Sequence, residues 1–172
     1  MGNSRHAQRQ LAFQTLYSMY FTQVATLDEL KKLFESTPDA AADDAARTGN
    51  ASAADNTKNE NADTAMHEHV RKAGDLAWHI VRGVWENQSR IDALITEVAN
   101  RSMSRIGRIE QVILRMASFE MMTTKASEIK IPLSEAVILS EEFGDARSRQ
   151  FINGLLNGIS RMVTEKGMTL NA

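Results

Sequence analysis

The chain has 172 residues, of which 42% are hydrophobic, and a formal net charge of −2 at pH 7. The length suits one domain, and the absence of cysteine excludes disulfides, cysteine nucleophiles and zinc sites built from cysteine. No apolar run approaches the roughly 18–20 residues that cross a bilayer. No apolar segment follows the basic residues at the start of the chain, so we expect a cytoplasmic protein.

The charged residues are unevenly distributed along the chain. Residues 37–66 hold six acidic and two basic residues, so the rest of the chain carries a net charge of +2. Within that remainder, three local basic clusters stand out, which are Arg5 and Arg9, then Arg101, Arg105, Arg108 and Arg115, and finally Arg147 and Arg149. Because nucleic acids respond to local charge, these groups are candidates for a nucleic-acid surface despite the acidic total.

The N-terminal region predicts two helices followed by an insertion. Residues 4–21 place apolar side chains on one helical face, namely Phe13, Leu16, Tyr17, Tyr20 and Phe21. Thr26 and Glu29 fit a capping box that opens a short second helix. Residues 37–66 contain no Ile, Leu, Val or aromatic residue and cannot bury enough apolar surface to offset the entropy of ordering. We expect a flexible insertion rich in Ala, Asp and Asn.

Helical patterns then continue to the C-terminus. Residues 67–87 and 91–98 predict two helices, divided by a cap within the sequence SRID that begins at Ser89. The clearest 3.6-residue period covers residues 106–122. The next helix is expected to start at Pro132 and to end at Gly144, a natural C′ residue.

A last helix over residues 148–163, with Gly167 just beyond it, completes the pattern. No segment alternates with period two, so we predict an all-α fold of about seven helices in a single domain. Within that domain, residues 1–36 and 67–88 form the N-terminal helices and residues 89–166 the C-terminal helices.

Catalytic motifs are lacking in this sequence. His67 and His69 are two residues apart, so in a helix they point about 200° from each other and cannot share a metal ion. Glu141 and Glu142 are adjacent, which makes them a poor acid–base pair and favours a solvated helix face. No glycine-rich phosphate loop occurs. We therefore expect a binding module without cofactor or metal rather than an enzyme.

Two basic regions are candidate nucleic-acid contacts. Arg5, His6 and Arg9 lie in the first turns of the first helix, where a phosphate could lie between the two arginines. The alternative is a solubilising helix face, and charge alone does not separate the two. Cations at a helix start also oppose the helix dipole, which favours an anionic partner.

The second region is the start of the last helix. Arg147, Ser148 and Arg149 offer guanidinium, hydroxyl and backbone N–H donors to a phosphate or a base edge. Phe151 is a candidate for stacking on an unpaired base. The alternative is that Phe151 packs on the preceding helix, and the pattern alone favours that alternative.

Several motifs, in order, resemble the NusB family. The first helix, RHAQRQLAFQTLY, is similar to the opening of that family, and so is WHIVRGVWENQSRIDALI. The closest stretches are LRMASFEM, EAVILSEEFG and SRQFINGLL. The resemblance covers most of the chain except the insertion. It implies a helical bundle in two small subdomains.

The resemblance also implies a function. NusB-family proteins bind boxA RNA together with NusE, a small-subunit ribosomal protein, and support antitermination of ribosomal RNA operons in a complex of RNA polymerase and other Nus factors. Carried over by position, it assigns RNA contacts to Arg5, His6, Arg9, Arg108, Arg147, Ser148, Arg149 and Phe151. It assigns Tyr17 and Glu110 to partner contacts. We expect a monomer or a weak homodimer.

This chain departs from the family in ways that bear on RNA binding. His6 and Ala7 stand where many members have arginine, so RNA affinity is expected to be weaker or sensitive to pH. Arg147 stands where an acidic residue is common and could offset that loss. Pro132 replaces a typical alanine, so we expect its helix to start later than in relatives.

Two other function classes are considered. A NusB-like domain of an RNA methyltransferase would need a glycine-rich cofactor domain, which this sequence does not contain. A helical adaptor that binds protein but not RNA would tolerate charge reversal of its arginines.

Overall fold

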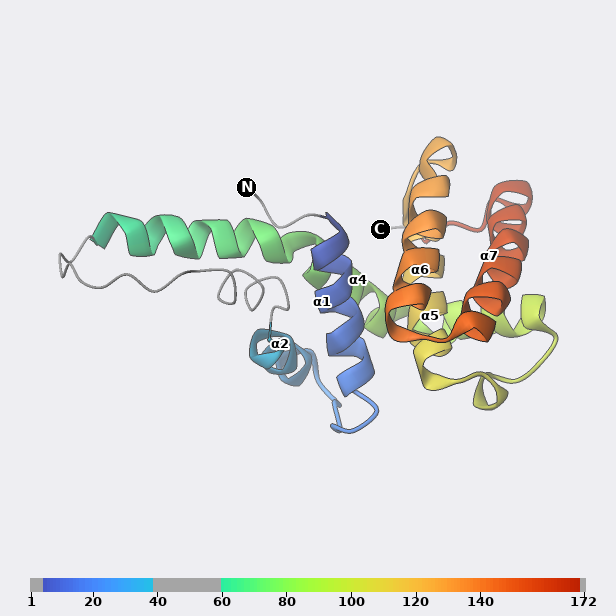
Figure 1. Ribbon diagram of the computed structural model, residues 1–172, viewed down its shortest axis with the longest axis horizontal. Helices are drawn as coiled ribbons and strands as arrows, with labels where there is room; N and C mark the ends of the chain where they lie inside the picture. Colours follow the sequence, from blue (N-terminus) through green and yellow to red (C-terminus); the bar gives the residue numbers. More distant parts are fainter. Residues whose placement is uncertain (1–4, 39–59, 171–172) are drawn as a thin grey trace.

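The computed structural model describes residues 5–38 and 60–170, with side chains from 5 to 38 and from 76 to 170. Its α-helices, labelled as in Figure 1, are α1 (Arg5–Ser18), α2 (Leu27–Ser36), α4 (Glu60–Ala99), α5 (Arg108–Thr123), α6 (Lys130–Phe143) and α7 (Ala146–Lys166). Two single-turn 3₁₀ helices cover Met103–Arg105 and Ala126–Glu128. The described residues contain no β-strand, which confirms the all-α class.

The described part holds six α-helices because two predicted helices form one. The boundary predicted at Ser89 is wrong, since α4 runs through it without interruption. Ser89 is exposed and Asp92 pairs with α5 instead of capping a helix. The buried stripe of α4 continues across the predicted boundary, through Ala77, Ile80, Val81, Val84, Ile91, Leu94 and Ile95. No glycine or proline after Gly83 interrupts that stripe, so nothing ends the helix there.

The start of α4 also differs from the prediction. The helix begins at Glu60, so residues 60–66 of the predicted insertion are helical, while residues 39–59 lie outside the described part. The helix breakers Pro38 and Gly49 lie upstream of this point. Extending an existing helix avoids the cost of nucleation, so weak helix formers can join it.

Most of the remaining helix ends follow from local sequence. Thr26 caps α2 and forms the predicted capping box with Glu29. Gly167 ends α7 in the left-handed region at φ 61°. Gly144 ends α6 as predicted, and its backbone is extended (φ −105°), so a glycine is needed there for close approach to the preceding turn. A Cβ there would lie 2.8 Å from the carbonyl oxygen of Ser140. The start predicted at Pro132 is two residues late, because α6 begins at Lys130. Pro132 is its third residue, where a missing N–H removes no intrahelical bond.

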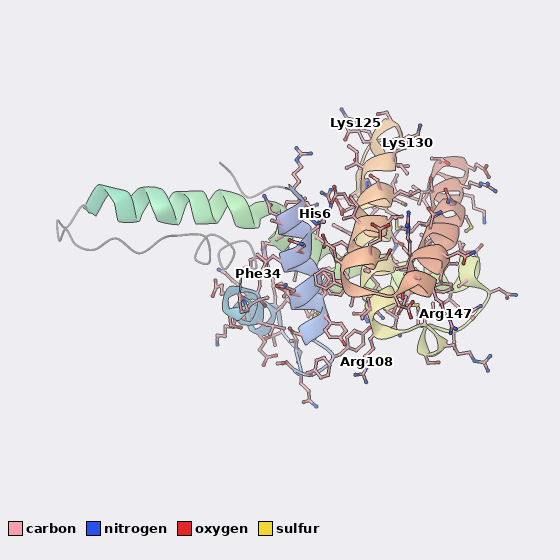
Figure 2. All side chains as sticks on the ribbon, in the orientation of Figure 1. His6, Phe34, Arg108, Lys125, Lys130 and Arg147 are labelled. Carbon is pink, nitrogen blue, oxygen red and sulfur yellow. The ribbon has the colours of Figure 1, made fainter. Side chains whose placement is uncertain are left out.

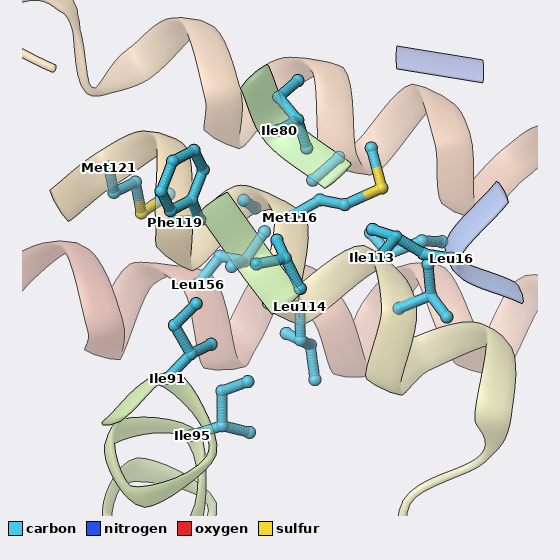
Figure 3. Packing of buried hydrophobic residues seen from close by; sticks show 14 of the residues in the cluster. Leu16, Ile80, Ile91, Ile95, Ile113, Leu114, Met116, Phe119, Met121 and Leu156 are labelled. Atoms are coloured by element: carbon cyan, nitrogen blue, oxygen red, sulfur yellow. The ribbon is translucent and has the colours of Figure 1, made fainter. Parts of the chain in front are cut away.

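The helices pack around one continuous apolar core. In Figure 1, α5, α6 and α7 lie together, α1 and α2 lie on the other side, and the first part of α4 extends away from both groups. The later part of α4 contacts α1, α5 and α7. Figure 3 shows the core in which these helices pack against one another. Its large buried side chains include Leu16, Ile80, Ile91, Ile113, Met116 and Leu156. The implied division into two subdomains stays a prediction.

A polar network links α4, α5 and the turn after α1. Arg115 donates to both carboxylate oxygens of Asp92, from Nε at 2.7 Å and from Nη2 at 2.8 Å. Its Nη1 donates to the hydroxyl of Tyr20 at 3.0 Å, and that hydroxyl donates to Gln111 Oε1 at 2.6 Å. Arg115 was grouped by sequence with the basic clusters, but only 13% of its side chain is exposed. It is therefore part of the scaffold.

Substitution by alanine should have opposite effects on stability at two glycines that both lie inside helices. Gly83 faces Phe119, and a Cβ at this position would lie 1.9 Å from its Cζ. We expect Gly83→Ala to destabilise the fold by about 1–3 kcal/mol through overpacking. Gly154 has no atom within 4 Å of an added Cβ. Gly154→Ala should stabilise by about 0.5–1 kcal/mol. Urea unfolding of both variants measures this, and equal stabilisation by both would show that Phe119 yields without cost.

Candidate nucleic-acid interface

The connection between α4 and α5 meets the start of α7 around an open cavity of about 220 Å³. Three exposed arginines, two carboxylates and one aromatic ring share its lining, which consists of Arg101, Arg105, Ile106, Gly107, Glu110, Asp145, Arg147, Ser148 and Phe151. Four of these residues were predicted from the sequence as RNA or partner contacts. We refer to this set as the arginine cavity.

The connection that carries Arg101 and Arg105 has a defined backbone. Asn100 takes a left-handed conformation (φ 48°), which ends α4 and turns the chain. Gln111 of α5 then holds the connection, because its Nε2 donates to the carbonyl oxygens of Met103 at 2.9 Å and Ile106 at 2.8 Å. Both arginines therefore project from a turn that is fixed by hydrogen bonds.

Ser148 joins the two sides of the arginine cavity. Its backbone N–H donates to Asp145 Oδ1 at 2.8 Å, which caps α7. Its hydroxyl donates to the carboxylate of Glu110 on α5. The bond from the Ser148 N–H lowers the pKa of Asp145 below its ordinary value, so this carboxyl is ionised at neutral pH. The structure thus brings a predicted RNA contact and a predicted partner contact together in one hydrogen bond.

Phe151 lies at the edge of the arginine cavity with a cation over its ring. The side chain is half-buried and packs against the core, and the guanidinium carbon of Arg101 lies 5.4 Å from the ring centroid. The ring thus packs on the fold and also lines the cavity, and its stacking on a base stays a prediction. Arg147 is exposed in the same cavity.

Arg108 and Tyr17 lie on a neighbouring aromatic surface rather than in the arginine cavity. The guanidinium carbon of Arg108 lies 5.4 Å from the ring centroid of Tyr20 and 5.7 Å from that of Phe21. Tyr17 contacts Phe21 with 5.6 Å between centroids. Phe21 is 67% exposed. Figure 2 shows Arg108 and Arg147 toward the same end of the molecule, far from Lys125 and Lys130.

Arg149 also lies outside the cavity lining. Its Nη1 is 2.8 Å from Glu141 Oε1, and both side chains are exposed. Such a surface pair contributes at most about 1 kcal/mol. Arg149 is therefore available to an anionic partner at small cost.

Arg9, one of the predicted RNA contacts near the N-terminus, has a structural role. This residue is 4% exposed, and its guanidinium binds Glu120 of α5 through Nε at 3.0 Å and Nη2 at 2.7 Å. Its Nη1 donates to the carbonyl oxygen of Arg5 at 3.3 Å. The predicted phosphate clamp between Arg5 and Arg9 is not formed, because Arg9 is buried in an ion pair. Arg5 itself is exposed.

His6 bridges α1 to two carboxylates of α6. Its Nδ1 lies 2.9 Å from Glu135 Oε2, and its Nε2 lies 2.9 Å from Glu142 Oε1. Burial acts to lower the pKa of His6, but the hydrogen bonds and charges of the two glutamates outweigh it and raise the pKa above 6.5. Arg9 is the nearest competing cation, with Nη1 3.9 Å from Glu135. The protonated His6 ring is therefore paired with carboxylates of the protein.

Sequence reasoning left Arg101 and Arg105 out of the site, although it grouped both with the basic clusters. Their contribution depends on the left-handed Asn100 and on Gln111, neither of which a charge pattern reveals. Among the described residues no cluster of acidic and histidine side chains could hold a metal. The side chains of His67 and His69 lie outside the described part. No described helix is long and apolar enough to cross a membrane.

Comparisons with known proteins show which family this chain resembles. A sequence model of the NusB family matches residues 6–161. The transcription antitermination protein NusB of Nitratidesulfovibrio vulgaris strain Miyazaki F is 32% identical over 96% of this chain and 93% of its own length. The NusB protein of Desulfovibrio desulfuricans is 31% identical over 92% of this chain and 85% of its own length.

Solved structures share the fold. NusB of T. maritima superimposes with a TM-score of 0.66 at 22% identity, covering 94% of this chain and 93% of that one. A crystal structure of antitermination factors NusB and NusE in complex with dsRNA gives a TM-score of 0.64 at 20% identity, covering 91% of this chain and 96% of that one.

Removal of Arg9 should destabilise the protein strongly. Arg9→Met leaves Glu120, which is 12% exposed, without its buried partner, and we expect a loss of about 3–5 kcal/mol. Arg82 forms an exposed i, i+4 pair with Glu86 on α4 and is the matched control. Arg82→Met should cost about 0.5 kcal/mol or less. Equal losses for the two variants in urea unfolding would contradict a structural role for Arg9.

The His6 contacts should make stability depend on pH. Because the folded-state pKa exceeds the unfolded value near 6.5, the stabilisation is complete below about pH 6.5 and is lost as pH rises through the folded pKa. The Tm advantage of the wild type over His6→Gln should therefore be largest at pH 5.5 and shrink toward pH 8.5. Gln10→Ala removes a hydrogen bond that an amide, which does not titrate, donates to Glu142, so its Tm difference should vary little between pH 5.5 and pH 8.5. A flat profile for His6→Gln would contradict the assignment.

Proposed function

The chain belongs to the NusB family, and from that premise we propose that it is a transcription antitermination factor that binds boxA RNA together with NusE. The complex would form with RNA polymerase and other Nus factors on ribosomal RNA operons. This role is one of binding without catalysis, and it implies a cytoplasmic location. The names of the relatives and the NusB–NusE–dsRNA neighbour support this assignment.

The observation that carries the RNA-binding part is the arginine cavity. Arg101, Arg105 and Arg147 are exposed around one opening, with Phe151 at its edge. Exposed guanidinium groups bind phosphates, and an adjacent aromatic ring can stack on an unpaired base. This combination of charges and ring suits single-stranded RNA better than a duplex, whose bases are already stacked.

The observation that supports a protein partner is the aromatic surface beside that cavity. Tyr17, Phe21 and Arg108 form a mixed aromatic and cationic surface, and Phe21 is 67% exposed. Aromatic residues and arginine are typical of interface centres. Glu110 lies between this surface and the RNA side, because it is in the first turn of α5, two residues after Arg108, and binds Ser148 of α7. We assign the NusE contact to this surface.

RNA binding should depend on Arg147 and fall with salt. Fluorescence anisotropy with labelled single-stranded boxA RNA, with and without NusE, measures the affinity at low and near-physiological salt. We expect tighter binding with NusE and a slope of log K against log salt of about −0.7 for each phosphate contact. Arg147→Glu should weaken binding at least tenfold, which is about 1.4 kcal/mol.

The matched control lies on the same helix. Arg161 is also an exposed arginine of α7, and ten residues separate it from Phe151, or about 15 Å along the axis. Arg161→Glu should leave RNA affinity within about twofold of wild type, since it lies beyond the cavity lining. Absence of RNA binding by the wild type, with or without NusE, would reject the proposal and favour a protein-binding adaptor.

A further inference from the structure

We propose that Arg101 and Phe151 form a clamp for one unpaired RNA base, with the base held between the phenyl ring and the guanidinium plane. This inference rests on the proposed RNA-binding function and names the residue that secures the base. Its basis is the position of the Arg101 guanidinium over the Phe151 ring, 5.4 Å from the centroid, at the edge of the arginine cavity.

The first argument is that Arg101 is free to move. Its side chain is exposed, and among the described residues it makes no hydrogen bond or ion pair, while its guanidinium lies over the Phe151 ring. The backbone beneath it is fixed, because Gln111 holds the carbonyl oxygens of Met103 and Ile106. A mobile planar cation on a fixed turn can swing outward and return at little cost.

The second argument concerns space. A stacked base occupies about 3.4 Å along the stacking direction. A guanidinium already 5.4 Å from the ring centroid leaves too little room for a base between two faces. The base must therefore displace Arg101, whose planar group can then stack on the outer face of the base. Phe151 stays in place because it packs against the core.

The third argument concerns charge. The arginine cavity places Arg101, Arg105 and Arg147 against the carboxylates of Glu110 and Asp145. The net positive charge is small, so phosphate attraction alone gives weak binding there. A stacking contribution of roughly ten- to a hundredfold in affinity would then be the larger effect. An acidic protein segment would gain nothing from the ring, which favours a nucleobase as the occupant.

The test separates stacking from charge through conservative variants. Arg101→Lys keeps the positive charge but loses the planar group, whereas Arg101→Ala loses both. We expect both variants to bind single-stranded boxA RNA at least tenfold more weakly than wild type, with the salt slope unchanged for lysine. Arg105→Lys is the matched control in the same cavity, and it should bind within about threefold of wild type, since its charge is retained. Circular dichroism and Tm should match wild type for all three.

An abasic scan of the RNA locates the clamped base. One abasic position should weaken binding by wild type about as much as Arg101→Lys does, and the same RNA should bind wild type and Arg101→Lys equally. If Arg101→Lys binds the RNA as tightly as wild type does, the clamp is overturned and Arg101 makes only a phosphate contact. Weaker binding of NusE alone by Arg101→Ala, with RNA binding intact, would overturn it in favour of a protein contact. If wild type binds no RNA, the proposed function fails together with the clamp, whereas failure of the clamp alone leaves RNA binding by wild type intact.

Discussion

The arrangement of the arginine cavity and of the aromatic surface depends on the hydrogen-bond network that Arg115 and Gln111 make inside the bundle. Arg115 donates hydrogen bonds to both carboxylate oxygens of Asp92 and to the hydroxyl of Tyr20. That hydroxyl donates to the side-chain oxygen of Gln111. The side-chain nitrogen of Gln111 in turn donates to the carbonyl oxygens of Met103 and Ile106. Burial alone would lower the pKa of Arg115, but Asp92 and Tyr20 outweigh it, so the guanidinium stays charged. Because each polar group there has its partners only within the network, its parts stabilise one another.

This network explains why two surfaces lie beside each other. One end fixes the connection that carries Arg101 and Arg105, and the other end fixes Tyr20, on which Arg108 rests. Hydrogen bonds from α5 thus set the positions of the two arginines of the connection and of the ring that Arg108 contacts. The arginine cavity and the aromatic surface are consequences of one set of buried contacts rather than independent features.

Sequence patterns predicted the parts of the fold that local physics decides. The capping box at Thr26 and the end of the last helix at Gly167 are decided by local sequence, and both agree with the prediction. The division at Ser89 was wrong, because a cap sequence cannot outweigh an apolar stripe that continues through it. The site residues also divide into those that local motifs predicted and those that depend on distant contacts. Phe151 and Ser148 follow from motif positions, whereas the burial of Arg9 depends on Glu120, 111 residues away in sequence.

The contrast among the arginines shows how the fold separates stability from binding. Arg9 and Arg115 have side chains only 5% and 13% exposed, and each makes a bidentate contact with a carboxylate. Releasing Arg9 for RNA would leave the largely buried Glu120 unpaired, at a cost of about 3–5 kcal/mol. A phosphate contact at the surface returns less than that.

Only arginines outside such pairs, or in exposed pairs such as that of Arg149 with Glu141, can serve RNA without loss of stability. Three exposed arginines in the cavity would give a salt slope of only about −2, which is modest. A binding site with so few charges needs a second source of affinity. Base stacking and a partner protein on the adjoining surface are the two sources that this arrangement offers, and a partner acts by raising the effective concentration of the RNA at the site.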